Sequence, residues 1–222
     1  RREGFSDAFT LQTPVADTQI DMGTEQQASD EIKKIALEFG DGLVGITNYD
    51  NRWEYSRKFS DMSATSRPAE IPDTLNNVIV IAQPMDYELV RTVPSALSGS
   101  ATGLGYSHDA LTVLSLTQYI RNLGYEAIGS MNDTSLAIPY AIKAGLGEYG
   151  RHGLLITPKY GPRIRLGKVY TNLPLAHDRP IRFGVKEFCE ICRRCTKGCP
   201  VKAIPDGPPS KDTHNQSNIL GV

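Results

Sequence analysis

Four cysteines, the only ones in the 222-residue chain, lie close together near its C-terminal end. They follow the pattern Cys-x-x-Cys-x-x-Cys-x-x-x-Cys-Pro, at Cys189, Cys192, Cys195 and Cys199. Thiolates at this spacing bind iron–sulfur clusters, in which the first three hold one cubane and the fourth ligates the other cluster of a two-cluster ferredoxin. Zinc sites usually pair two separated couples of ligands, and disulfides between such close neighbours would be strained. The run therefore predicts an iron–sulfur centre that transfers electrons.

The ligand set of this run is incomplete. Cys189, Cys192 and Cys195 need one more ligand, and Cys199 needs three companions, but the chain has no further cysteine. We therefore expect the chain to be a fragment, with a second cysteine motif downstream. The alternative is a single cluster bound by all four cysteines. Three basic residues between the ligands either offset the negative charge of a cluster or form an ordinary solvated loop.

Length, composition and charge restrict the function. A chain of 222 residues with 40% hydrophobic residues can form one sizeable core and a small appendage. Its formal net charge of −1 argues against general nucleic-acid binding, which needs an excess of Lys and Arg. No stretch reaches the roughly 18 apolar residues of a membrane helix. The N-terminal Arg1-Arg2 resembles a twin-arginine export signal, but the polar stretch after it favours chance.

Short apolar segments alternate between strand and helix patterns, which favours an α/β or α+β core. Residues 1–28 are expected to form a polar arm, and Ser29 to cap the first helix. Residues 96–105, rich in Gly, Ser and Ala, are expected to form a loop before a helix over 107–123. A further helix is expected over 136–144, and strands over 43–46, 76–82, 125–128, 154–157 and 164–171.

The small residues Gly103 and Gly105 precede Tyr106 and would let the backbone approach a large flat ligand closely. Composition alone leaves each polar residue here with an ordinary interpretation. A tyrosine such as Tyr106 more often packs than acts as an acid, and Arg165 alone would be a surface ion-pair partner. Trp53 and Tyr55 are candidates for an aromatic wall around an apolar substrate, with core packing as the equal alternative.

The chain resembles the catalytic subunits of respiratory reductive dehalogenases. The matching segments are residues 43–46, 52–56, 106–107, 144–157, 160–165 and 169–175, followed by the cysteine run. The resemblance covers residues 30–205 and is most specific in the second half. Epoxyqueuosine reductases share the layout, but they would carry a Trp and a Lys-Asn around the Gly-Leu-Gly stretch at 145–147.

The resemblance implies a cobalamin-type corrinoid, bound base-off in a nitroreductase-like core at residues 29–180, and two 4Fe-4S clusters. The clusters would belong to a ferredoxin-like segment, truncated here to residues 181–222. The catalytic tyrosine of the family matches Tyr106, its partner asparagine Asn132, and its tyrosine-tuning arginine Arg165, with Arg163 as a close competitor. The expected corrinoid contacts are Gly103, Gly105, Ser107, Gly145 and Gly147.

The implied reaction is reductive cleavage of a carbon–halogen bond, which needs two electrons and one proton. A Co(I) corrinoid fed by the clusters would reduce the organohalide, and a tyrosine would donate the proton. The family also implies twin-arginine export, a small membrane-anchor protein as partner, and a place on the outer face of the cytoplasmic membrane. The sequence does not identify the organohalide or the electron donor. An epoxyqueuosine reductase-like enzyme acting on tRNA, and a ferredoxin-like carrier without a substrate, are the alternatives.

Overall fold

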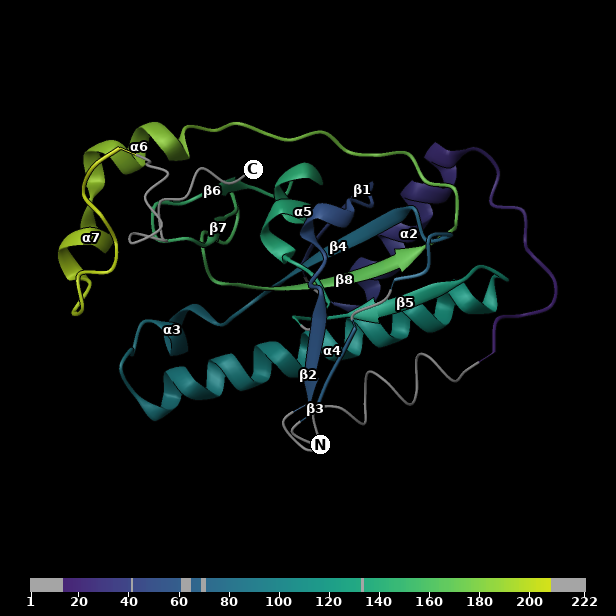
Figure 1. The fold of residues 1–222 in the computed structure, drawn as a ribbon, viewed down its shortest axis with the longest axis horizontal. Coiled ribbons are helices and arrows are strands. Elements are labelled where there is room, and N and C mark those ends of the chain that lie inside the picture. The colour runs from purple at the N-terminus through teal and green to yellow at the C-terminus, as the bar shows by residue number, and fades with distance from the viewer. Residues whose placement is uncertain (1–13, 41, 61–64, 69–70, 133, 209–222) are drawn as a thin grey trace.

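A four-stranded antiparallel sheet forms the centre of the molecule, in a computed structural model that describes residues 14–40, 42–60, 65–68, 71–132 and 134–208. The strand order is β1-β4-β8-β5 (Figure 1). These strands are β1 (Leu43–Asn48), β4 (Asn77–Pro84), β5 (Ala127–Ser130) and β8 (Ile164–Thr171). The mixed helix and strand class is confirmed, while the nitroreductase-like and ferredoxin-like descriptions stay predictions.

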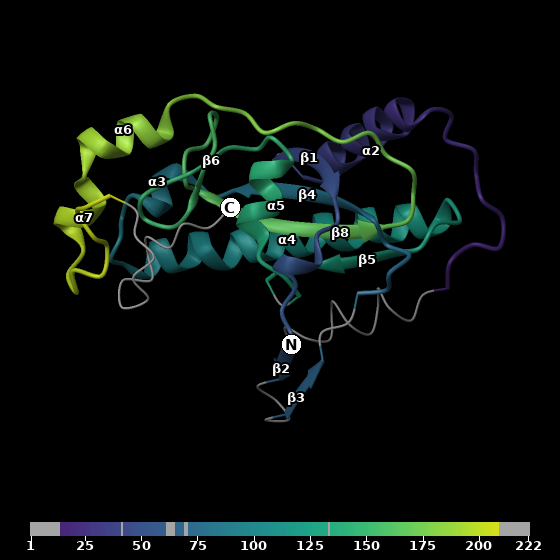
Figure 2. The same ribbon diagram turned by 45° about the horizontal axis from the view of Figure 1, so that its top comes forward.

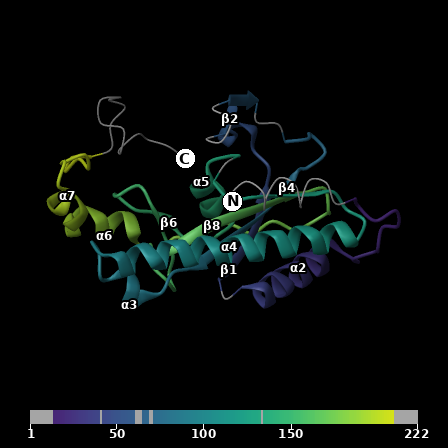
Figure 3. The ribbon, with the colours of Figure 1, turned by 90° about the horizontal axis from the view of Figure 1, so that it is seen from below.

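The sheet is covered on both faces. Side chains alternate along β4, so that Ile79 and Ile81 enter one core cluster while Val78 and Val80 enter another. The first cluster lies under α2 (Glu25–Phe39) and α4 (Ala96–Asn122), which run side by side in Figure 3. The second lies under the short helix α5 (Ala137–Lys143). Burial on both faces explains why residues 78–82 of β4 are an unbroken apolar run without polar alternation.

The first helix begins earlier than its pattern predicts. Thr24 is the N-cap of α2 and forms a capping box with Gln27, whose backbone N–H donates to the threonine hydroxyl. The prediction that Ser29 caps this helix is wrong, because Ser29 is buried in the helix and its hydroxyl donates to the carbonyl of Ala176. Capping chemistry one turn upstream therefore sets the start of the helix.

The long helix α4 includes the stretch that was expected to be a loop. It starts at a capping box between Ser95 and Ser98 and continues through Gly103 and Gly105 to Asn122. The prediction of a loop over 96–105 is therefore wrong. Glycines cost a helix interior about 0.5–1 kcal/mol each, but the cap and the packing of α4 on β8 outweigh that cost here.

Smaller elements surround this core. They are η1 (Asn51–Trp53), β2 (Arg57–Ser60), β3 (Thr65–Pro68), α3 (Tyr87–Val90), β6 (Glu148–Tyr149), β7 (Leu155–Ile156), α6 (Val185–Cys192) and α7 (Arg194–Gly198). The β2–β3 hairpin projects from the body in Figure 2. After β8 the chain runs back across the molecule and places α6 beside β6. Among the described residues, no helix is long and apolar enough to cross a membrane.

The sequence located most strands but not all of their ends. The expected strand 164–171 coincides with β8, and the segments 43–46 and 76–82 lie almost wholly in β1 and β4. The strand expected over 125–128 is observed two residues later, as β5. Tyr125 is not part of it, because its N–H donates to the carbonyl of Ile120 at the end of α4.

Candidate active site

Two side chains from separate parts of the chain, Asn132 and Arg165, meet at the phenol oxygen of Tyr106. The amide Nδ2 of Asn132 donates a hydrogen bond to the Oη of Tyr106 at 3.0 Å. Nη1 of Arg165 lies 3.5 Å from the same oxygen, and the guanidinium carbon lies 4.5 Å from the centre of the phenol ring. The fold thus brings Tyr106 together with Asn132, which is 26 positions away in the sequence, and with Arg165, which is 59 positions away.

The contact between α4 and β8 positions Tyr106 and Arg165. Gly105 makes this contact possible, because a Cβ at that position would lie 3.1 Å from Cγ of Arg165 and 3.0 Å from Cγ of Met85. The stem of Arg165 therefore crosses the helix at the residue before Tyr106, and its guanidinium reaches the ring.

Asn132 lies on the segment that follows β5, and this segment is held at several points. The fully buried ammonium of Lys168 donates to the carbonyl oxygens of Met131 and Ser135, on either side of Asn132. The N–H of Leu136 donates to the carbonyl of Trp53 at 2.8 Å. These contacts fix the backbone from which the Asn132 amide reaches the phenol.

The structure distinguishes the two candidate arginines. Nη1 of Arg163 donates to the backbone carbonyl of Met85, and its guanidinium carbon lies 5.1 Å from the ring centre of Tyr87. Arg163 thus contacts Met85 and Tyr87, at the start of α3, whereas Arg165 contacts Tyr106. The geometry therefore favours Arg165 for a role at the phenol.

This arrangement suits a phenol that gives up a proton. Asn132 and Arg165 both donate toward the phenol oxygen, which leaves the single O–H donor of Tyr106 available to another molecule. Donors and positive charge at the oxygen stabilise the negative charge that remains after the proton leaves. Tyr106 is 37% exposed. Part of its side chain therefore lies on the surface of this chain.

Asp109 is a buried residue near this site that the sequence did not single out. It follows Tyr106 by three residues on α4, and its side chain is only 1% exposed. Burial raises the pKa of Asp109 to about 7, against the opposing attraction of Lys168 and Arg165. The signal that could have found it is an acidic residue on the helix face that carries Val113 and Leu116 into the core.

The glycines and the serine expected to contact a corrinoid divide into two groups. Gly103 and Ser107 lie on the exposed face of α4, and a Cβ at Gly103 would meet nothing within 4 Å. In contrast, a Cβ at Gly145 would lie 2.6 Å from the carbonyl oxygen of Arg179, and one at Gly147 would lie 2.2 Å from that of Ile156.

Gly145, Gly147 and Gly105 thus lie where the chain packs closely on itself. Gly145 also has a φ of +74°, which favours glycine where α5 ends. Their contact with a corrinoid stays a prediction. The open face of α4 at Gly103 and Ser107 is the part of the predicted set that fits a large flat group.

The four cysteines are free thiols on and after the last two helices. Cys189 and Cys192 lie on α6, Cys195 lies on α7, and Cys199 follows it. The backbone N–H of Ala203 donates to Sγ of Cys199 at 3.3 Å and is the main cause of the lowered pKa of this thiol. Donors of this kind support a thiolate ligand.

The arrangement of these thiols is not yet that of a metal site. Within the described part of the chain, no three His, Cys, Asp or Glu side chains are gathered closely enough to hold a metal ion. The type of donor therefore fits an iron–sulfur cluster, while its ligation by these cysteines stays a prediction.

Two charged residues of the β6 region anchor the cysteine-bearing segment to the core. Oε2 of Glu148 accepts the N–H of Phe183 at 2.6 Å and that of Val185 at 3.2 Å, at the start of α6. Nη1 of Arg151 donates to the carbonyls of Pro205 and Gly207, beyond α7. Both ends of the segment thus depend on one short stretch, residues 148–151.

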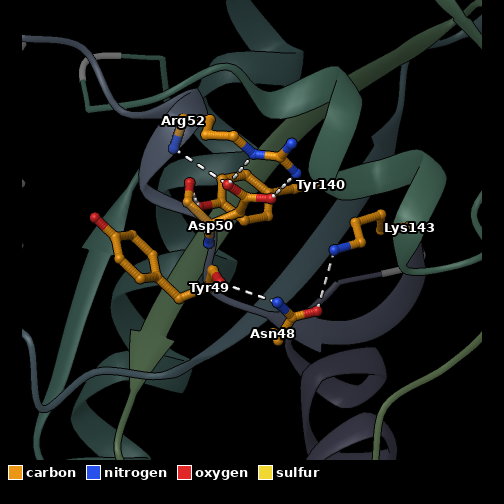
Figure 4. Close-up of polar contacts among 6 residues, drawn as sticks. All are labelled: Asn48, Tyr49, Asp50, Arg52, Tyr140 and Lys143. Atoms are coloured by element: carbon orange, nitrogen blue, oxygen red, sulfur yellow. Dashed lines mark hydrogen bonds and ion pairs between the residues drawn. The ribbon is translucent and has the colours of Figure 1, made fainter. Parts of the chain in front are cut away.

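Trp53 is a residue of the hydrophobic core. It is only 9% exposed and packs edge-on against Tyr140, with 4.8 Å between the ring centres. Figure 4 shows polar contacts of Tyr140 and of Lys143: the Tyr140 hydroxyl donates to the carbonyl of Asp50 at 3.0 Å, and Nζ of Lys143 lies 3.2 Å from Oδ1 of Asn48. The core-packing interpretation of Trp53 therefore holds.

Tyr55 remains exposed, and its backbone N–H donates to the carbonyl of Thr134. It thus lies beside the segment that carries Asn132, and a place for its ring in a substrate wall stays a prediction.

Comparison with known proteins identifies the family. The family model described as a reductive dehalogenase subunit matches residues 63–175, a span that includes Tyr106, Asn132 and Arg165. The tetrachloroethene reductive dehalogenase of Dehalobacter restrictus is 39% identical over 215 residues, which cover 82% of this chain and 39% of that protein. The chain thus spans about two fifths of the length of this relative.

A solved reductive dehalogenase structure, which suggests a mechanism for B12-dependent dehalogenation, matches with a TM-score of 0.77 and 27% identity over 88% of this chain and 28% of that one. The epoxyqueuosine reductase of Lactococcus garvieae is also 39% identical, but over 77 residues only, 34% of this chain and 21% of that protein. This chain belongs to the reductive dehalogenase family.

Proposed function

We propose that this chain forms the proton-donor side of a reductive dehalogenase that converts an organohalide, two electrons and one proton to the dehalogenated product and halide. The observation that carries this proposal is the convergence of Asn132 and Arg165 on the phenol oxygen of Tyr106. The family and the match to a B12-dependent relative support it.

Each of the three residues has a distinct role in this proposal. Tyr106 gives its hydroxyl proton to the carbon that loses the halogen. Arg165 stabilises the resulting tyrosinate by charge and by a hydrogen bond. Asn132 donates a second hydrogen bond and keeps the ring in one orientation. The tyrosinate must then take up a proton from solvent before the next turnover.

We propose two cofactors for the complete protein. A corrinoid, when bound, supplies the reduction of the carbon–halogen bond. The exposed face of α4 at Gly103 and Ser107, beside Tyr106, is where the chain would contact it. Cys189, Cys192 and Cys195 would hold one 4Fe-4S cluster, and Cys199 would ligate a second. Zinc, or no metal, in anaerobically prepared full-length protein would contradict the cluster assignment.

The substrate class and the partners are also proposals. We propose a small organohalide as substrate, because relatives matched over 82% and 85% of this chain are tetrachloroethene reductive dehalogenases. The family resemblance supports a small membrane-anchor protein and a place on the outer face of the cytoplasmic membrane. Fractionation of the native cells, with the membrane washed by salt and then by detergent, tests this placement.

The decisive experiment compares two tyrosines that are equally exposed. Tyr106→Phe and Tyr55→Phe are made in the full-length protein with corrinoid and clusters, since both tyrosines are 37% exposed. Halide release with a chemical reductant should fall by about 100-fold or more in Tyr106→Phe, and should change little in Tyr55→Phe. Cofactor content is measured in both variants. Full activity in Tyr106→Phe with normal cofactor content would end the proposed donor role.

A further inference from the structure

Two buried polar atoms in the contact between α4 and β8 have no hydrogen-bond partner among the described residues. They are Oδ1 of Asp109 and Nε of Arg165, and they belong to side chains of opposite charge. An unpaired buried polar atom costs about 1–3 kcal/mol. Such atoms are therefore rare unless a bound water or a functional constraint accounts for them. Because one of the two side chains also contacts Tyr106, a functional constraint is the better account.

The backbone places the Asp109 carboxyl on the same side of β8 as Arg165. Side chains alternate along a strand, so positions 165 and 167 share a face. A Cβ at Gly167 would lie 2.4 Å from Oδ1 of Asp109, so the carboxyl occupies the space that this glycine leaves. On α4, Asp109 lies one turn beyond Gly105, the residue over which the Arg165 stem crosses.

We propose that Asp109 is a positioning residue that acts through Arg165, by offsetting part of its charge and so setting how strongly the guanidinium holds the phenol oxygen of Tyr106. This inference rests on the proposed function, because it matters for the reaction only if Tyr106 donates the proton. No direct contact between Asp109 and substrate is involved.

The ionisation of Asp109 determines in which direction the effect of Arg165 on Tyr106 changes with pH. The charged groups that act on Asp109 are Arg165 and Lys168, both on β8, and they oppose the effect of burial, which raises the pKa to about 7. Below this pH the carboxyl is neutral and the full charge of Arg165 acts on the phenol oxygen. Above it the carboxylate offsets part of that charge. Arg165 should therefore assist proton donation best at the acidic side of neutrality.

The test uses a reporter that does not depend on turnover. Tyrosine labelled with carbon-13 at Cζ, which keeps the ordinary phenol pKa near 10, is placed at position 106 of the full-length holoenzyme, and its carbon resonance is followed between about pH 5.5 and 8.5. The resonance should show an inflection near neutrality as Asp109 ionises. The inflection should be lost in Asp109→Asn and reduced by about half or more in Arg165→Gln, which keeps the carboxyl but removes the group that transmits its charge.

Halide release adds a second readout. The rate of Asp109→Asn relative to the unsubstituted enzyme should rise about threefold or more between pH 6 and pH 8, since the variant loses the offsetting charge. If Asp109 had a purely structural role, the isosteric change Asp109→Asn would lower the rate equally at pH 6 and at pH 8.

Two results would overturn the inference. One is an inflection that persists unchanged in Asp109→Asn. The other is the absence of any inflection in the protein that retains Asp109, a result that does not require the variant to fold. Either result leaves the role of Tyr106 intact, whereas full activity of Tyr106→Phe removes that role without affecting the reporter titration.

Discussion

Arg165 on β8 and Tyr106 on α4 form a stacked pair, with the guanidinium carbon 4.5 Å from the ring centre and Nη1 3.5 Å from the phenol oxygen. This geometry gives Arg165 two favourable contacts, one with the face of the ring and one with its oxygen. Arg163, two positions earlier, instead bonds to the carbonyl of Met85. The two arginines therefore make a matched pair for experiment.

Arg165→Gln should lower halide release by about tenfold to a hundredfold, because the tyrosinate loses about 1.4–2.8 kcal/mol of stabilisation. Arg163→Gln should change the rate by no more than about threefold, which corresponds to less than 1 kcal/mol. Rates are measured in the full-length holoenzyme at saturating reductant. A larger loss in Arg163→Gln would reassign the tuning role to Arg163.

Gly105→Ala and Gly103→Ala should have opposite effects on stability. Alanine in a helix interior gains about 0.5–1 kcal/mol over glycine, and Gly103 has open space around it. At Gly105 the new methyl would press on Arg165 and Met85, at 3.1 and 3.0 Å. We expect denaturant unfolding to show a gain for Gly103→Ala and a loss for Gly105→Ala, together with slower halide release in the latter. Equal gains would show that Arg165 moves aside freely.

Asp109→Asn should change the pH dependence of stability. The pKa of Asp109 is about 7 in the fold against the ordinary 3.8, so its favourable contribution is complete below about pH 3.8 and is lost as the pH rises toward 7. Between pH 5 and pH 8 the unsubstituted protein should therefore lose about 2–3 kcal/mol relative to Asp109→Asn. Urea unfolding at both values measures this difference, and parallel stabilities would contradict it.

Glu148→Gln should loosen the start of α6. Burial tends to raise the pKa of Glu148, but the N–H groups of Phe183, Val185 and Gly184 outweigh it and lower the pKa. The contribution of the carboxylate is therefore present above the ordinary pKa of a glutamate and is lost as the pH falls through the lowered one. Loss of these charge-assisted bonds should cost about 1 kcal/mol locally.

Amide hydrogen exchange at residues 183–188 measures this cost, and it should be about fivefold faster in Glu148→Gln. The control is Glu187→Gln, because Glu187 lies on the same helix and makes only an exposed ion pair with Arg182 at 3.4 Å. Equal exchange in the two variants would mean that Glu148 does not anchor the segment.

The sequence predicted two central strands well, because residues 78–82 form a compact apolar run and residues 164–171 alternate as in a strand. Ile164–Thr171 and Asn77–Pro84 could be read from their residue types alone, since burial against helices requires such residues. The start of α4 could not, because Gly103 and Gly105 argue locally for a loop, and the helix depends on the capping box at Ser95 and on the packing of α4 against β8.

The candidate site was predicted from a resemblance and could not be built from spacing. Nothing local relates Tyr106 to Asn132 or Arg165, which meet only after the antiparallel pairing of β5 with β8 brings their segments together. Asp109 was missed for a related reason. That the Asp109 carboxyl is buried can be seen only when β8 is packed against α4. The space that Gly167 leaves for this carboxyl also exists only in that packing.

The alternation of side chains along β8 has an evolutionary consequence. On one face of β8, Arg165 reaches α4 and the phenol oxygen of Tyr106. On the other face, Lys168 donates a hydrogen bond to the backbone carbonyl of Met131, next to Asn132. Deleting one residue between them would turn either one to the wrong side of the sheet. Substitutions that adapt the enzyme to new halogenated substrates should therefore accumulate in the surrounding loops. Insertions and deletions between Arg165 and Lys168 should be absent from its descendants.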